Sequence, residues 1–277
     1  MWEKLMNIDV RIIYGLVLVS IVLPLLWPMG LPIPVTKDVR RVYDTIQALP
    51  DSARVLFEFS AAGGSLPELE PQGIALLYHL AEKHAKLYIM SASTEAPLVA
   101  ERALSIYRDK GFKAGVDYVN MGYFSGGESG IAAMCDSIVK TFPADINGTP
   151  TASMPIMQGV KGVDSMDLVI VMNGSGIADW VRQIVTTYKR PMVCGVLAVM
   201  GPGSVPYVQS GQIKGLLVGL KAAAEYEQLV KKPGKGAASM DAQSVAHLLV
   251  IGLVVLGNIG FYMNKKSRAS QGGPSNV

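Results

Sequence analysis

The chain carries two long apolar stretches, one near each end, and they constrain its fold more than any motif between them. One runs from Ile12 to Trp27 and the other from Val245 to Met263. They have 16 and 19 residues, which at 1.5 Å per residue is close to the ~30 Å hydrocarbon core of a bilayer. We therefore expect a globular domain that two transmembrane helices attach to a lipid bilayer.

The first stretch does not have the features of a cleaved signal peptide. Met1 to Arg11 carries as many acids as bases, and prolines rather than a small-residue cleavage site follow the apolar run. The sequence therefore predicts an uncleaved anchor. The expected organisation is an anchor with a proline-rich collar over residues 1–35, a domain over 36–232, a linker over 233–243, a transmembrane helix over 244–264 and a disordered tail over 265–277.

The side of the membrane on which the domain lies is not decided by charge. Lysines and arginines flank the two stretches in nearly equal numbers on both sides. Cys135 and Cys194 lie in apolar segments and are expected to be buried free thiols, which favours a cytoplasmic domain. The net charge is +3 with no basic stripe, so nucleic acid is not an expected partner.

Apolar runs and amphipathic segments alternate along the domain. This pattern predicts an α/β fold with a parallel, Rossmann-like or flavodoxin-like sheet of about five strands and helices on both faces. The order of the strands cannot be read from the sequence. The expected strands are residues 54–59, 87–90, 117–120, 168–172 and 192–199, and the expected helices are residues 36–48, 67–83, 95–110, 128–139, 177–188 and 212–230.

The segments that follow the expected strands are rich in glycine and serine. In a parallel sheet these segments gather at one edge, where backbone N–H groups and helix N-termini favour an anion. The same residue types also serve ordinary turns and helix caps, so both interpretations stay open. The candidate ligand-binding residues are Gly63, Gly64, Ser65, Ser91, Gly126, Gly127, Ser129, Asn173, Gly174, Ser175 and Glu58.

Glu58 is an acidic residue inside the first expected strand, between Phe57 and Phe59. A buried glutamate is either paired or has a raised pKa. A salt bridge to a lysine or arginine is the ordinary outcome, and a functional acid in a pocket is the alternative.

Specific catalytic and cofactor motifs are missing from the sequence. There is no phosphate-binding G-x-x-x-x-G-K-[ST] motif, no GxGxxG after the first strand, no HExxH and no CxxC. His79 and His84 are expected to cap a helix or to face solvent. No metal and no cofactor is therefore predicted.

One segment resembles an enzyme family. Val55 to Leu80, with Gly63-Gly64-Ser65 between a strand and a helix, resembles the region around the oxyanion glycines of signal-peptide-peptidase-type serine proteases. That resemblance implies Ser91 or Ser93 as the nucleophile and a lysine as its base, but no lysine in the sequence is marked as this partner.

Three segments resemble a group of prokaryotic membrane-anchored proteins of unknown activity. They are Pro67 to Leu80, Asp117 to Tyr123 and Gly211 to Glu227, which together extend over nearly all of the domain. The resemblance implies an anchored α/β domain and nothing about a substrate.

Two sets of glycines are candidates for a helix interface. Within the expected helix 212–230 and just before it, glycines recur at every fourth residue, and such a face suits close helix contact. Replacing two of them with leucine is expected to disturb packing or assembly. The candidate interface residues are Gly211, Gly215, Gly219, Gly252, Gly257 and Gly260.

These observations lead to three hypotheses about function. The first is a non-catalytic structural or assembly subunit of a membrane complex, with other membrane-protein subunits or a second copy of the chain as partners. The second is a membrane-tethered binding or sensory domain for a small anionic ligand. The third, more remote, is a serine hydrolase. The sequence leaves open whether the chain is an enzyme.

Overall fold

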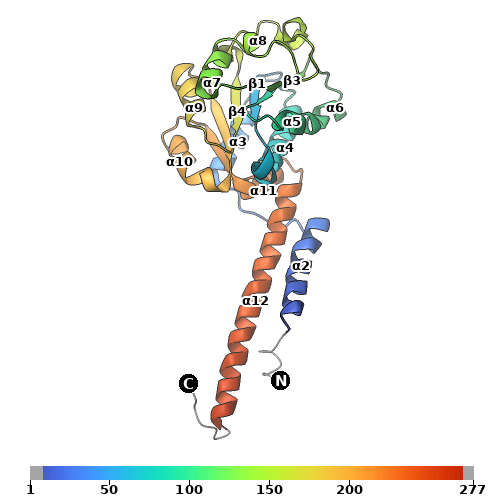
Figure 1. Ribbon diagram of the computed structural model, residues 1–277, viewed down its shortest axis with the longest axis vertical. Helices are drawn as coiled ribbons and strands as arrows, with labels where there is room; N and C mark the ends of the chain where they lie inside the picture. The colour runs from blue at the N-terminus through green and yellow to red at the C-terminus, as the bar shows by residue number, and fades with distance from the viewer. Residues whose placement is uncertain (1–8, 271–277) are drawn as a thin grey trace. The chain divides into compact units, whose positions relative to one another are not determined.

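A computed structural model describes residues 9–270 of the chain, with side chains for residues 9–266 (Figure 1). The chain divides into two units. One consists of Met1–Leu31 and Ala238–Val277, and the other is Pro32–Ala237. The second unit holds the sheet and its helices.

The domain is an α/β fold, as the sequence predicts, with six parallel strands rather than about five. Nearly every strand residue is buried, because helices cover both faces of the sheet. The strands are β1 (Arg54–Phe59), β2 (Lys86–Ser91), β3 (Tyr118–Tyr123), β4 (Leu168–Met172), β5 (Met192–Val196) and β6 (Gly215–Val218).

The strand order is β3-β2-β1-β4-β5-β6, which is the order of the doubly wound Rossmann arrangement. The order reverses between β1 and β4, whose pairing runs from Val55 beside Leu168 to Phe59 beside Met172. Ligands of open α/β sheets bind outside the carboxyl ends of the strands near such a reversal. The fold therefore marks the segments after β1 and β4 as the place to look for a site.

Successive strand residues point to opposite faces, and the core divides accordingly into two clusters. Val55, Phe57 and Phe59 of β1 belong to one cluster, and Leu56 belongs to the other. The helices over the first face are α3 (Lys37–Gln47), α4 (Leu66–Glu82), α5 (Ala96–Ala103), α6 (Ser105–Asp109) and α11 (Gly219–Leu229).

The second face is covered by shorter and less regular elements. They are α7 (Gly127–Asp136), α8 (Ile138–Thr141), α9 (Ala178–Trp180), the π-helix η5 (Val181–Thr187) and α10 (Gly201–Gln209). Single 3-10 turns complete the domain, namely η1 (Gly63–Ser65), η2 (Thr151–Ser153), η3 (Pro155–Met157), η4 (Val163–Ser165) and η6 (Ala198–Met200).

The expected helix over residues 212–230 is wrong in its first part, because residues 215–218 form β6. Leu217 faces one core cluster and Leu216 faces the other, which is the burial of a strand. Gly219, with a φ of +65°, then begins α11. Gly211, Gly215 and Gly219 therefore lie in a turn, a strand and a helix start, and they do not share a helix face.

The expected strand over residues 192–199 is too long, and α10 after it has no counterpart among the expected helices. Gly201-Pro202-Gly203 indicates a turn, yet Pro202 lies in the first turn of α10, where a proline has no N–H bond to lose.

One histidine is also placed differently from the expectation. His79 is buried, with its ring nitrogens 2.8 Å from the Tyr226 hydroxyl and 3.0 Å from Gln47 Oε1. Burial lowers the pKa of His79 to about 4.

Within residues 9–270, one helix is long and apolar enough to cross a membrane. It is the stretch Lys235–Lys266 of α12 (Lys235–Ser270), whose most apolar 18-residue segment has a mean hydropathy of 2.0. The expected pair of membrane-spanning helices is not supported, because α2 (Val10–Leu26) has 17 residues with Pro24 inside it. At 1.5 Å per residue such a helix is about 26 Å long, short of the ~30 Å hydrocarbon core.

The segments that flank α12 also differ from the expectation. The expected linker over residues 233–243 is largely helical, because α12 begins at Lys235. The expected disordered tail over residues 265–277 is helical as far as Ser270, and residues 271–277 lie outside the described part.

The proline-rich collar is bound by one carboxylate in its own unit. Asp241, 1% exposed, accepts hydrogen bonds from the backbone N–H groups of Met29 at 2.7 Å, Gly30 at 2.8 Å and Leu31 at 3.0 Å. Successive N–H groups directed at one carboxylate form an anion nest. This nest ties the collar to α12.

Candidate functional site

A pocket of about 260 Å³ lies where the segments after β2, β3 and β4 meet. It is therefore at the carboxyl edge of the sheet, where the sequence places its candidate site. The lining residues come from those three segments and from the starts of α7 and α9. They are Ala92, Tyr123, Phe124, Ser125, Gly126, Gly127, Ile131, Asn173, Ser175, Gly176, Asp179 and Trp180.

The turn between β3 and α7 contributes the glycines of the pocket. Gly126 is the N-cap residue of α7 with a φ of +110°, and Gly127 follows with a φ of +54°. L-residues rarely adopt these angles, so the turn requires glycine for its shape. The first N–H groups of a helix have no partner within it. The turn therefore presents backbone donors beside the pocket.

The turn after β4 is stabilised by its own side chain. Asn173 Oδ1 accepts a hydrogen bond of 2.7 Å from the N–H of Ser175, which is the geometry of an Asx turn. Asn173 is 8% exposed, so most of its side chain is buried at the carboxyl edge of the sheet. The bond fixes the loop that carries Ser175 and Gly176 along the pocket.

Glu58 is fully buried on β1, and its expected salt bridge does not form. Its Oε1 accepts from the Ser60 hydroxyl and, at 3.4 Å, from the N–H of Ala92. Its Oε2 has no hydrogen-bond partner among the described residues. Desolvation raises the pKa of Glu58 to about 8, although Ser60, Ala92, Met172 and Asn173 act in the opposite direction. The group is therefore a neutral acid at pH 7.

Ser60 and Ser91 continue the network from Glu58 to the end of β2. Their Oγ atoms are 3.2 Å apart, and the N–H of Ala92 donates to Ser60 Oγ at 3.0 Å. The Ser91 hydroxyl donates to the Ser93 carbonyl at 3.0 Å and accepts from the Ser93 N–H at 2.9 Å. The network thus joins a buried acid to the loop that bears Ala92, a pocket residue.

Ser91 is fully buried and has no basic side chain among its described partners. Activating a serine nucleophile requires a base within hydrogen-bond reach. The geometry around Ser91 therefore gives no support to the serine hydrolase hypothesis.

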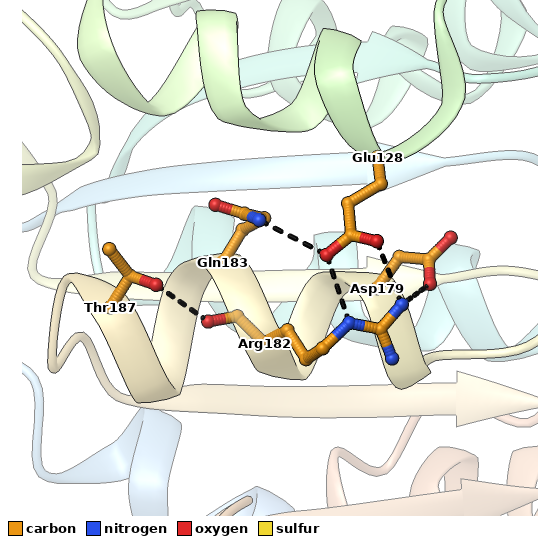
Figure 2. A network of polar contacts seen from close by, with 5 residues as sticks. All are labelled: Glu128, Asp179, Arg182, Gln183 and Thr187. Atoms are coloured by element: carbon orange, nitrogen blue, oxygen red, sulfur yellow. Dashed lines mark hydrogen bonds and ion pairs between the residues drawn. The ribbon is translucent and has the colours of Figure 1, made fainter.

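An ion-pair cluster joins the two helices that flank the pocket (Figure 2). Arg182 donates to both oxygens of Glu128, from Nε and Nη2, each at 2.9 Å, and also to Asp179. Gln183 adds a bond of 3.1 Å to Glu128 Oε1, and the Thr187 hydroxyl donates to the Arg182 carbonyl at 3.0 Å. The hydrogen bonds from Arg182 and then Gln183 lower the pKa of Glu128 to about 2.

Two neighbouring residues of η5 reach one carboxylate. η5 is a π-helix, which has a wider turn than an α-helix, and such segments recur at functional sites. Arg182 and Gln183 both extend from it to Glu128 in the first turn of α7. The cluster therefore connects α7 to η5 at the side of the pocket where Asp179 lies.

The candidate residues divide into those that line the pocket and those that do not. Gly126, Gly127, Asn173 and Ser175 line it. Gly63, Gly64 and Ser65 form η1 at the start of α4, where the Ser65 hydroxyl donates to the Ala62 carbonyl at 2.7 Å. The remaining candidates do not line the pocket either. Glu58 and Ser91 belong to the buried network, Gly174 lies against Ser65, and Ser129 is exposed on α7.

Several pocket residues have no signal in the sequence. Phe124 and Trp180 are ordinary core aromatics by type, 6% and 3% exposed. Their rings meet edge to face with centroids 5.9 Å apart, and this contact brings β3 and α9 together. Only the strand order, which the sequence does not reveal, places them side by side.

The candidate interface glycines of α12 differ in their surroundings among the described residues. No described atom lies within 4 Å of a Cβ added at Gly252 or Gly257, and Gly260 is buried. Their role in contacts with another chain stays a prediction.

The two cysteines are free and buried, as expected. Burial raises the pKa of the Cys135 thiol to about 12 and raises that of Cys194 as well. Among the described residues, no group of three or more His, Cys, Asp or Glu side chains is arranged to hold a metal ion.

When the chain is compared with models of known families, with curated proteins and with solved structures, none of them matches. Both family resemblances therefore stay predictions.

Proposed function

We propose that this chain is a membrane-tethered binding domain that holds a small ligand with an anionic group in the pocket at the carboxyl ends of β2, β3 and β4. The observation that carries the proposal is the position of the pocket. It lies at the edge where open α/β sheets bind ligands, and turns from three strands converge on it.

The lining of the pocket supports an anionic group as part of the ligand. The backbone of Gly126 and Gly127 approaches the pocket at the positive end of the α7 dipole. Asp179 also lines the pocket, but Arg182 pairs with it and with Glu128, which offsets part of their negative charge. Ser175 adds a polar side chain to the same lining.

The tether in this proposal is α12. Its long apolar stretch is the feature that favours a membrane location, and the proposal assigns it the role of a single anchor. An assembly subunit is the first hypothesis from the sequence. Its support from a glycine-lined helix is lost, because residues 215–218 are a strand.

The test uses the full chain purified in mild detergent. Inorganic phosphate, acetate and glycerol 3-phosphate serve as anionic probes, and glycerol serves as a neutral probe. We expect at least one anionic probe to raise the unfolding temperature in a concentration-dependent way, because binding to the folded state stabilises it.

A pocket-filling variant makes the test specific. Ala92→Leu adds a side chain inside the pocket and keeps the N–H that bonds to Ser60. It should abolish the rise in unfolding temperature, whereas Ala133→Leu on the exposed side of α7 should leave that rise unchanged. If no anionic probe changes the unfolding temperature, and native mass spectrometry finds stoichiometric partner chains instead, the assembly hypothesis replaces this one.

A further inference from the structure

A second groove, of about 360 Å³, lies on the other face of the sheet, between α4 and the pair α5 and α6. It is separate from the pocket of the proposed function and shares no residue with it. Its lining combines apolar and polar side chains, namely Glu70, Ile74, Tyr78, Arg102, Ala103, Ser105 and Ile106.

Three cations border this groove. Arg102 lines it, and its guanidinium forms no hydrogen bond or ion pair among the described residues. The Lys232 ammonium lies 5.8 Å from the centroid of the Tyr78 ring, and Lys235 Nζ is 2.8 Å from Glu70 Oε2. Of the four charged groups at the groove, only Glu70 is negative, so the groove is complementary to an anion.

The apolar lining of the groove argues against a free inorganic anion. Ile74, Tyr78 and Ile106 offer hydrocarbon surface directly beside the unpaired Arg102. A ligand that satisfies both has an anionic group joined to methylene groups. This is the chemistry of a phospholipid at the boundary between its headgroup and its acyl chains.

The position of the cations along the chain favours the same class of ligand. Lys232 and Lys235 lie on the N-terminal side of the long apolar stretch, and Lys235 is the first residue of α12. The apolar run from Val245 begins ten residues later, which is about 15 Å along a helix. Basic groups this close to a membrane span attract anionic lipids.

We propose that the groove between α4 and α5–α6 binds the headgroup of an anionic phospholipid, with Arg102 and Lys232 contacting its phosphate. The inference rests on the membrane tether of the proposed function and not on its ligand pocket.

The test titrates the full chain in mild detergent with short-chain phosphatidylglycerol or phosphatidylcholine and counts bound lipids by native mass spectrometry. We expect selective retention of phosphatidylglycerol. Removing two cations near a lipid surface weakens binding by about tenfold or more, so Arg102→Ala/Lys232→Ala should lose this selectivity. Lys140→Ala, at an exposed lysine of α8 on the other face, should retain it.

Three results would overturn the groove assignment. They are equal binding of both lipids, unchanged selectivity in the double variant, and binding of glycerol 3-phosphate that the double variant weakens as much as it weakens binding of phosphatidylglycerol. Failure of the tether is seen separately, because a chain that stays soluble without detergent contradicts the tether whatever the lipid titration gives.

Discussion

The carboxyl group of Glu58 lies where an ionised side chain is costly, because it is fully buried with neither a lysine nor an arginine beside it. Hydroxyl and backbone donors reach one oxygen only. The folded state therefore favours the neutral acid over the carboxylate, which makes the stability of the molecule depend on pH.

The sign of that dependence follows from the pKa values of the folded and unfolded states. The pKa of Glu58 is raised from 4.5 to about 8 on folding, so the folded state retains a proton that the unfolded chain loses. The resulting stability is complete below pH 4.5 and is lost as the pH rises toward 8. A tenfold change in a proton-binding constant corresponds to about 1.4 kcal/mol, so the loss is on the order of a few kcal/mol.

Glu58→Gln should remove this dependence, because the amide keeps the shape of the acid and does not titrate. His79 has the opposite effect below pH 6.5, where its lowered pKa costs stability, so the comparison belongs between pH 6.5 and pH 8. Thermal unfolding is followed by circular dichroism at a series of pH values. The midpoint temperature should fall as the pH rises in the native chain and should change less in the variant. Glu82→Gln, at an exposed position of α4, is the control, and parallel profiles for Glu58→Gln and the native chain would contradict the prediction.

The sequence singles out Glu58 because an acid inside an apolar strand is unusual, and its burial is as expected. Ser60 is a local partner two residues further along the chain, whereas Ala92 could not be predicted, because it meets Glu58 only through the pairing of β1 with β2. The surroundings of His79 could not be predicted from the sequence either. Its position near a helix end suggests solvent, whereas the packing of α4 on α11 places it against Tyr226.

At the scale of elements, α4 lies close to the sheet because Gly73 faces β1. A Cβ added at Gly73 would overlap the ring of Phe59, which is itself fully buried. Gly73→Ala should therefore destabilise the fold by about 1–3 kcal/mol, since overpacking outweighs the gain of roughly 1 kcal/mol in helix propensity. Denaturant unfolding measures the difference.

Gly203→Ala in α10 is the matched control for this change. No described atom lies within 4 Å of a Cβ at Gly203, so only the gain in helix propensity remains and the variant should be at least as stable as the native chain. Equal stability changes in the two variants would argue against close packing of α4 on β1.

Gly215 belongs to a contact between a strand and a helix. An added Cβ would lie 2.7 Å from the backbone N of Val42 and 3.0 Å from the carbonyl oxygen of Asp38, both in α3. Backbone atoms cannot move aside as a flexible side chain does, so Gly215→Ala should separate α3 from β6. We expect a loss of at least about 1 kcal/mol in unfolding free energy. Hydrogen exchange should locate the disturbance in α3, and protection there equal to that of the native chain would refute the contact.

The first five strands are predictable because apolar residues predominate in each of them, as in parallel sheets covered on both faces. β6 is not, because Gly215–Val218 is only four residues long and adjoins the helix-forming run of α11. A short apolar run beside a helix pattern does not distinguish strand from helix. The glycines at 215 and 219 are unusual for a helix interior. Gly215 is required because α3 lies against β6 there, and Gly219 is required by the turn that begins α11.

At the scale of the whole molecule, the order of the strands decides where the pocket lies. The sequence places glycine-rich and serine-rich turns at one edge, but it does not reveal which turns are neighbours. With the order β3-β2-β1-β4-β5-β6, the turns after β2, β3 and β4 line the pocket, while the glycine turn after β1 forms the start of α4. The candidate residues therefore lie at one edge of the sheet, but some of them line the pocket and others form the start of a helix.

The number of membrane spans also belongs to this scale, and it fixes where the two ends of the chain lie. If α12 is the only span, the domain and the N-terminus lie on one side of the membrane and the C-terminus lies on the other. The argument for a single span is length, since α2 has 17 residues and an internal Pro24, fewer than the ~20 residues typical of a transmembrane helix. Two spans would instead place both ends on the same side.

Epitope tags at either end of the full chain, tested for protease access in sealed membrane vesicles, distinguish the two arrangements. We expect the N-terminal tag to share the accessibility of the domain and the C-terminal tag to show the opposite accessibility. Ile251→Arg/Val255→Arg places two charges in the apolar part of α12 and should release the chain from the membrane, because each costs about 2.5–3.5 kcal/mol at the bilayer centre. The matching pair Leu18→Arg/Val22→Arg in α2 should leave it bound. If both tags share one accessibility and the α2 pair releases the chain as well, α2 crosses the membrane and the single anchor is wrong.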